Sequence, residues 1–165
     1  MRSDKLTVFW RFITHSGDRY VVIILGIILL LIKSLREKYG VKFAIAALSS
    51  TALYQIMKYI FQRPRPDLAL RLIEQGGYSF PSGHSMNCLV SYGILIYLLL
   101  KYCENRRLAK ILSVGLGLLT ILIGFSRVYV GVHYPTDIIG GWSLGIAVLV
   151  AMIYAFEKFD SRSEG

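Results

Sequence analysis

The sequence predicts an all-α fold, an integral membrane helical bundle of about five transmembrane helices with a short interfacial helix at its N-terminus. Of the 165 residues, 55% are hydrophobic, and the mean hydropathy of +0.53 is too high for an ordinary soluble domain of this length. Five apolar segments follow one another and leave too little polar sequence to cover them. The length leaves room for one domain, over residues 1–165.

The N-terminal segment, residues 1–17, is mildly amphipathic. Its apolar residues at helical spacing are Leu6, Phe9, Trp10 and Ile13. This pattern predicts a helix that lies along the membrane surface. Charged residues interrupt the segment and it has no small-residue cleavage site, so we expect no cleavable signal peptide.

The segments that we expect to cross the membrane are residues 20–32, 43–57, 85–100, 111–125 and 138–156. A span needs about 20 residues, and only the last segment is nearly that long by itself. The first two need flanking residues whose Lys and Arg side chains can reach back to the interface. Buried core helices are the competing interpretation for stretches this short.

The number of spans predicts which loops share a side of the membrane. With five spans, the N-terminus and the loops 58–84 and 126–137 lie on one side, and the loops 33–42 and 101–110 lie on the other with the C-terminus. The second side carries ten of the 19 Lys and Arg residues. Three of the remaining nine belong to the polar clusters described below, so the balance favours a cytoplasmic second side and outward-facing clusters.

The net charge of +9 does not by itself indicate a nucleic-acid partner. The basic residues are spread through every loop and form no long run, which is typical of residues that flank membrane spans. We therefore expect the bilayer, and no nucleic acid, as a partner. Cys88 and Cys103 show neither the spacing of a zinc site nor a disulfide framework.

Lys58 and Arg65 form the first polar cluster. Lys58 precedes Arg65 by seven residues, at the end of an apolar segment where Arg63-Pro64-Arg65-Pro66 stops any helix. Both cations can therefore reach one anion, although interfacial anchoring is an alternative for each. Arg63 is expected to be such an anchor.

The second cluster is Pro81-Ser82-Gly83-His84, directly before an apolar segment. Pro81 suits the start of a helix, and Gly83 allows close backbone approach. The free N–H groups of a helix start, with the Ser82 hydroxyl, would hold an anion. His84 could then act as a general acid. A helix cap with an idle His84 is the alternative.

The third cluster contains Arg127, His133 and Asp137, with Pro135 as a helix starter. A carboxylate four residues after a histidine can hold one imidazole nitrogen as N–H and leave the other free for nucleophilic attack. A polar helix cap is the alternative. Asp137 beside a bilayer is costly, however, and this cost favours a functional role.

The clusters contain the groups that phosphoryl transfer needs, because its catalysis consists mainly of positioning and electrostatic stabilisation of spread negative charge. Two histidines and one carboxylate among three cations would repel a divalent metal ion, so we expect no metal and no other cofactor. The third histidine, His15, joins no cluster and is expected to be a surface residue.

In order and spacing, these clusters resemble the signature of the type 2 phosphatidic acid phosphatase superfamily. The matching residues are Lys58-x6-Arg65-Pro66, Pro81-Ser82-Gly83-His84 and Ser126-Arg127-x5-His133-x3-Asp137. No signature position is unfilled. The short hydrophobic chain looks like the bacterial members that act on phosphatidylglycerol phosphate, phosphatidate or undecaprenyl pyrophosphate. It departs from the family in one respect, since these membrane enzymes usually have six spans.

The resemblance implies a role for each matched residue. His133 would be the nucleophile that forms a phosphohistidine, Asp137 would orient it, and His84 would protonate the leaving group. The residues that would hold the phosphate are Lys58, Arg65, Ser82, Gly83 and Arg127. Water would then hydrolyse the phosphoenzyme without a metal.

We therefore expect a multi-pass cell-membrane enzyme that hydrolyses a lipid phosphomonoester or pyrophosphate at the extracytoplasmic face. Two alternatives remain: a non-catalytic subunit that binds or transports anionic lipids, and a phosphatase of a soluble phosphate ester. The paired histidines with a carboxylate argue against the first, because binding alone needs neither acid nor nucleophile. Homo-oligomer formation is left open.

Overall fold

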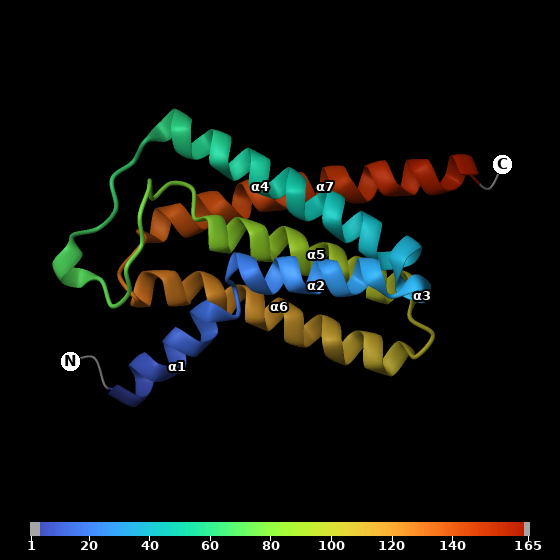
Figure 1. The fold of residues 1–165 in the computed structure, drawn as a ribbon, viewed down its shortest axis with the longest axis horizontal. Helices are drawn as coiled ribbons and strands as arrows, with labels where there is room; N and C mark the ends of the chain where they lie inside the picture. Colours follow the sequence, from blue (N-terminus) through green and yellow to red (C-terminus); the bar gives the residue numbers. More distant parts are fainter. Residues whose placement is uncertain (1–3, 164–165) are drawn as a thin grey trace.

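The computed structural model describes residues 4–163, and every regular element in this range is helical (Figure 1). The elements are α1 (Asp4–His15), α2 (Arg19–Leu31), α3 (Lys33–Leu35), the π-helical turn η1 (Arg36–Gly40), α4 (Val41–Phe61), the 3₁₀ turn η2 (Leu68–Leu70), α5 (Gly83–Tyr102), α6 (Arg106–Tyr129) and α7 (Pro135–Ser163). The predicted all-α class is confirmed.

The bundle is built around α5, which packs against α4, α6 and α7. Met86, Val90, Ile94 and Leu98 repeat along α5 at helical spacing and are completely buried. The outer helices α2, α4, α6 and α7 instead present many large apolar side chains to their surroundings. Apolar surface of this extent on a helical bundle is suited to contact with lipid chains.

The number of membrane spans differs from the prediction. Among the described residues, α5, α6 and α7 are long and apolar enough to cross a bilayer, and α1 with α2 would form a fourth span if the bent pair counts as one. The predicted span in residues 43–57 lies within α4, whose 21 residues fall outside this group. Its polar side chains serve helix packing: the Ser50 hydroxyl donates to Asn87 Oδ1 on α5 at 2.6 Å. By length and composition, three or four spans among the described residues qualify, against the five that the sequence predicted.

The N-terminal helix is not simply an interfacial helix. α1 meets α2 at 43° and packs against the end of α6, where Trp10 stacks on Tyr129 with ring centroids 5.6 Å apart. At the turn between α1 and α2, a Cβ on Gly17 would lie 2.6 Å from Ile123 of α6, so glycine permits this close approach. The first three residues of the predicted segment lie outside the described range.

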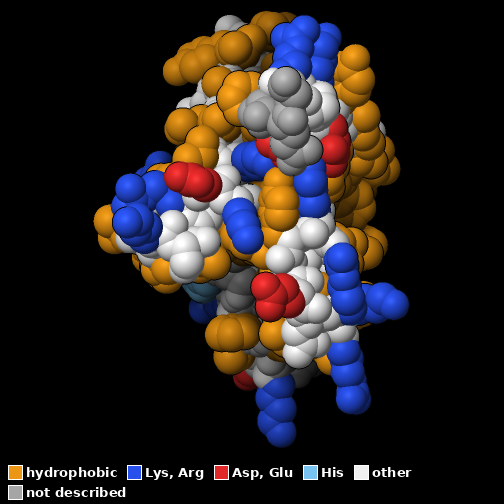
Figure 2. All heavy atoms as spheres, turned by 90° about the vertical axis from the view of Figure 1, so that its right-hand side faces the viewer, with side chains coloured by type: hydrophobic (Ala, Val, Ile, Leu, Met, Phe, Trp, Pro, Cys, Tyr) orange, Lys and Arg blue, Asp and Glu red, His pale blue; other side chains and the backbone are white. Residues whose placement is uncertain are grey.

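The two ends of the bundle differ in their chemistry. At the end where α5 stops and α7 finishes, Asp160 accepts hydrogen bonds from Lys42 of α4 and Lys101 of α5, with its nearest oxygen 2.7 and 3.0 Å from the two ammonium groups. Figure 2 looks onto this end and shows Lys and Arg side chains exposed on several sides of it. The loop 62–82, the start of α5, the end of α6 and the start of α7 gather at the other end (Figure 1).

Candidate active site

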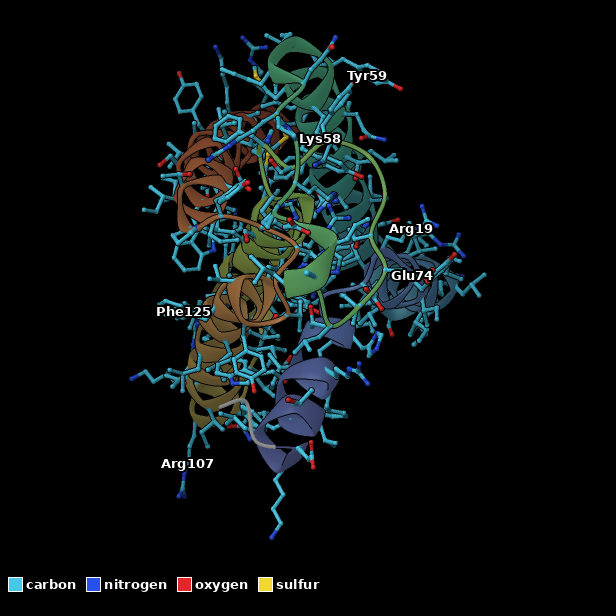
Figure 3. All side chains as sticks on the ribbon, turned by 90° about the vertical axis from the view of Figure 1, so that its left-hand side faces the viewer. Arg19, Lys58, Tyr59, Glu74, Arg107 and Phe125 are labelled. Carbon is cyan, nitrogen blue, oxygen red and sulfur yellow. The ribbon has the colours of Figure 1, made fainter. Side chains whose placement is uncertain are left out.

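A cavity of about 540 Å³ opens at the second end, between the α1–α2 turn, α4 and the start of α5. Six of the eight residues that the sequence predicted for the site line it: Lys58, Arg65, Gly83, His84, Arg127 and His133. The prediction that the three clusters share one side of the bundle is therefore confirmed. Figure 3 looks onto this end, with Lys58 on α4 and Arg19 at the start of α2 labelled.

His133 is held between a carboxylate and a guanidinium. Its Nδ1 lies 3.3 Å from Asp137 Oδ2, and its Nε2 lies 3.1 Å from Arg65 Nη1. A carboxylate only accepts and a guanidinium only donates, so Nδ1 carries the proton and Nε2 offers its lone pair. Burial, together with the neighbouring cations, lowers the pKa of His133 although the Asp137 hydrogen bond opposes this. The imidazole is therefore neutral at physiological pH, as a nucleophile must be.

Asp137 does not line the cavity but lies behind His133, completely buried in the first turn of α7. The predicted start of this helix at Pro135 is confirmed. The Asp137 carboxylate accepts two further hydrogen bonds besides its contact with His133. One comes from the Tyr134 amide at 2.9 Å, and the other comes from Arg63 Nη1, 2.8 Å from the second oxygen. The sequence did not predict the contact with Arg63. Arg63 also donates to Thr136 at 2.7 Å.

Arg63 is thus not the interfacial anchor that the sequence suggested. The Arg-Pro-Arg-Pro segment points its two guanidinium groups at the two members of one pair, Arg65 at His133 and Arg63 at Asp137. The repeated Arg-Pro unit is visible in the sequence. The sequence does not indicate, however, which of the two arginines contacts a carboxylate 74 positions later. A buried carboxylate that is paired with a cation is more stable than one left without a charged partner.

Replacement of Arg63 by Gln should lower kcat about tenfold, the equivalent of about 1.4 kcal/mol. The effect is limited because 37% of the Arg63 side chain is exposed and its pair with Asp137 is screened on that side. Steady-state phosphate release from the purified variant measures it. A loss as large as that caused by changing Asp137 itself would contradict a merely supporting role for Arg63.

The three predicted cations differ in how they are held. Arg127, at the end of α6, is almost completely buried and donates to Thr14 of α1 at 2.7 Å and to Gln75 at 2.9 Å. Its Nε has no hydrogen-bond partner among residues 4–163. Lys58 donates to the carbonyl of Tyr78.

Arg65 is fixed by the backbone around it. It donates to the carbonyls of Gly77 at 2.9 Å and Val132 at 2.9 Å, in addition to its contact with His133. Burial and the nearby charge of Arg71 lower the pKa of Arg65 to about 10, which leaves it charged at neutral pH. Three basic side chains therefore line the same cavity as His133, and one of them, Arg65, donates to its Nε2.

The two residues of the Ser-Gly turn are placed differently. Ser82 is the N-cap of α5; its hydroxyl oxygen accepts from the amide of Ser85 at 3.4 Å and from the Ser85 hydroxyl at 3.0 Å. Ser82 is completely buried and does not line the cavity. Gly83 does line it, and a Cβ there would lie 3.2 Å from the Tyr54 ring.

His84 has a partner that the sequence did not predict. Its Nε2 lies 2.9 Å from Asp18 Oδ1, in the turn between α1 and α2. The other oxygen of Asp18 lies 2.8 Å from His15 Nδ1. His15 is a surface residue, as expected, but it is linked to His84 through Asp18, which the sequence did not predict. The sequence contains one signal for this contact. Residues 15–19 form a polar run that the span count places on the same side as the clusters.

No group of three or more His, Cys, Asp or Glu side chains within the described part of the chain is arranged to hold a metal ion. The chemistry that this cavity offers is a neutral imidazole nitrogen, a second histidine paired with a carboxylate, and a set of guanidinium and ammonium groups. Such a set can bind a tetrahedral dianion, attack it and protonate what leaves.

Comparison with known proteins gives relatives with related names. Phosphatidylglycerophosphatase B of Bacillus subtilis is 37% identical over 114 residues, which cover 67% of this chain and 54% of that protein. An undecaprenyl-diphosphatase of Sulfolobus acidocaldarius is 34% identical over 139 residues, which cover 81% of this chain and 63% of that protein. The chain thus spans less than two thirds of the length of either relative.

The fold and a family model agree with these relatives. The crystal structure of a transmembrane PAP2-type phosphatidylglycerolphosphate phosphatase from Bacillus subtilis superimposes with a TM-score of 0.84 and 30% identity, over 96% of this chain and 80% of that one. The model of the PAP2 superfamily matches residues 39–161, a range that includes all eight predicted site residues. The chain belongs to the PAP2 superfamily.

Proposed function

We propose that the chain is a membrane lipid phosphatase that hydrolyses a lipid phosphomonoester or pyrophosphate through a phosphohistidine. The observation that carries the proposal is the geometry of His133. Its Nδ1 is held by Asp137, which leaves Nε2 unprotonated, and the ring lines a cavity together with Lys58, Arg65 and Arg127. A binding protein would need the cations but not a histidine fixed in its nucleophilic tautomer.

In the first step, the lone pair of His133 Nε2 attacks phosphorus and the bond from phosphorus to the leaving oxygen breaks. His84 gives that oxygen a proton, so the product leaves as an alcohol or as a protonated lipid phosphate. Asp137 stabilises the positive charge that develops on His133 through the hydrogen bond to Nδ1–H. The cations stabilise the charge spread over the phosphoryl oxygens.

In the second step, water attacks the phosphohistidine. The neutral His84 left by the first step takes a proton from this water, the P–N bond breaks, and its electron pair returns to His133 Nε2. Inorganic phosphate leaves, and both histidines regain their initial protonation states. The cycle requires no net proton from other residues.

The apolar outer surface of the bundle supports a lipid as the phosphate carrier, because the reacting histidines lie at the end of helices suited to a bilayer. The relatives are named for phosphatidylglycerol phosphate and undecaprenyl diphosphate, and we propose these two, with phosphatidate, as candidate substrates.

Phosphate release from the detergent-solubilised chain tests the proposal with those three lipids in the presence of EDTA and with vanadate as an inhibitor. We expect vanadate-sensitive release from at least one lipid. Binding of all three lipids without any release would favour the anionic-lipid-binding alternative. Faster release from a water-soluble phosphate ester than from every lipid would favour the soluble-ester alternative.

Replacement of Arg127 by Ala should lower kcat/KM by about 10²- to 10³-fold, because one fixed electrostatic donor to the phosphoryl oxygens is removed. Arg107→Ala is the matched control, since Arg107 lies in the first turn of the same helix and its side chain is exposed away from the cavity (Figure 3). Equal activity of the Arg127 variant and the control would contradict the role of Arg127.

We further propose that the active site faces outward. The Lys- and Arg-rich loops at the opposite end would then remain in the cytoplasm. A topology experiment in a Cys103→Ser background uses two exposed positions, Glu74 beside the cavity and Glu104 between α5 and α6. We expect an impermeant maleimide to label Glu74→Cys on intact cells and Glu104→Cys only after permeabilisation. The reverse pattern would place the active site in the cytoplasm.

A further inference from the structure

We propose that Asp18 is the positioning residue of His84, whose carboxylate holds the Nε2 side of the ring and leaves Nδ1 to serve the leaving oxygen. This inference rests on the proposed function. Asp18 lies before residue 39, where the family match begins, and therefore belongs to a part of the chain that the family model does not describe.

The geometry connects a buried histidine with an exposed one through this carboxylate. Asp18 Oδ1 lies 2.9 Å from His84 Nε2, and Oδ2 lies 2.8 Å from Nδ1 of His15, whose side chain is 64% exposed. A Cβ on Gly17 would lie 3.2 Å from His84 Cδ2, the atom next to Nε2. This edge of the ring therefore lies against the α1–α2 turn, and Nδ1 is on the other edge.

An ordinary structural role does not explain the contact. Asp18 is the N-cap of α2, but its side chain makes no capping hydrogen bond to that helix, and both oxygens are engaged by histidines. It is also the one acidic residue among the described residues that line the cavity. A carboxylate there repels a phosphate and weakens substrate binding, so a compensating role in the reaction is expected.

The chemistry of a general acid provides that role. When Nε2–H donates to Asp18, only the doubly protonated imidazolium has a second proton, on Nδ1, to give to the leaving oxygen. Lys58, Arg65 and Arg127 line the same cavity and disfavour that charge, whereas Asp18 favours it. The hydrogen bond with His84 lowers the pKa of Asp18, so Asp18 stays a carboxylate and its charge attracts a proton to His84.

A test of this role compares two phosphate esters that differ in how much their leaving group needs a proton. Phosphatidate releases an alkoxide, which needs general-acid assistance, and a nitrophenyl phosphate bearing an alkyl chain releases a stable phenolate, which does not. For the full-length Asp18→Asn variant in detergent, we expect kcat on phosphatidate to fall about 30- to 100-fold and kcat on the aryl ester to fall at most about threefold.

Three variants complete the comparison. Asp18→Glu should recover part of the activity on phosphatidate, because it restores the carboxylate, and His15→Gln should show the same selective loss to a smaller extent. Asp4→Asn, the same change on the exposed first turn of α1, should leave both esters unaffected. If the Asp18→Asn chain cannot be recovered folded, two other results decide whether Asp18 positions His84. They are the selective loss in His15→Gln and the ratio of phosphatidate to aryl-ester activity in Asp18→Glu.

The outcomes separate this inference from the proposed function. A wild-type chain that hydrolyses neither ester contradicts the proposed function. A wild-type chain active on both, with a variant that loses both equally, limits Asp18 to a structural role and overturns the inference. A variant that gains activity also overturns it, because the carboxylate would then merely compete with the substrate phosphate.

Discussion

Replacement of His133 by Ala should abolish turnover, with a loss of at least about 10⁴-fold in kcat, as expected when a nucleophile is removed from a site that acts as a unit. Among the described residues that line the cavity, the other histidine is His84. Its Nε2 is paired with Asp18 of the α1–α2 turn, so it does not replace the Nε2 of His133, whose carboxylate partner Asp137 holds Nδ1. Phosphate release in the presence of EDTA measures the loss.

The same experiment can follow the intermediate directly. Wild-type chain quenched with denaturant during turnover of a radiolabelled substrate should retain acid-labile, alkali-stable label, as a phosphohistidine does. The His133→Ala chain should retain none. His84→Ala is the informative companion, since with an aryl phosphate it should still become labelled. Robust EDTA-resistant turnover by the His133→Ala chain would refute the assignment of the nucleophile.

Much of the candidate site was predictable because its residues follow a local rule. His133 and Asp137 are four positions apart across the start of a helix, and Pro135 marks where that helix begins. Helical geometry then brings the carboxylate to the imidazole without any knowledge of the tertiary fold. The segment boundaries were predictable for a similar reason, since each cluster interrupts an apolar run.

The residues that the sequence did not reveal act through long-range contacts. Arg63 reaches Asp137 and Asp18 reaches His84, over separations of 74 and 66 positions. Hydrophobic periodicity predicts that a segment is a helix but does not predict which polar side chains two helices bring together. The 43° bend between α1 and α2 decides where Asp18 lies, and no residue pattern specifies a bend angle.

The number of helices that qualify as spans by length and composition differs from the predicted five for a related reason. α4 is as long as a membrane span, yet its Ser50 and Lys58 side chains are used inside the protein, for a contact with α5 and for the cavity. Composition alone does not distinguish polar side chains that face the protein interior from those that would face lipid. A helix that lines a polar site can therefore be long without being as apolar as its neighbours.

Replacement of Asp137 by Asn should lower kcat by about 10³- to 10⁴-fold, although the side chain keeps its size. The carboxylate can only accept, which fixes the proton on His133 Nδ1. An amide can turn its NH₂ group towards Nδ1, and the proton then moves to Nε2, the atom that must attack. The substitution therefore favours the inactive tautomer in addition to removing a charge.

Comparison with Asp137→Ala separates these two effects. Alanine removes the charge and imposes no tautomer, so its loss should be smaller than that of Asn if the tautomer decides the rate, and equal if charge alone decides it. Nitrogen NMR of labelled histidine should show Nε2 unprotonated in the wild-type chain and protonated in Asp137→Asn. Addition of Arg63→Gln to Asp137→Asn should cost little more, because the Arg63 guanidinium acts through the carboxylate that is already gone. An additive loss would mean that Arg63 contacts the phosphate itself.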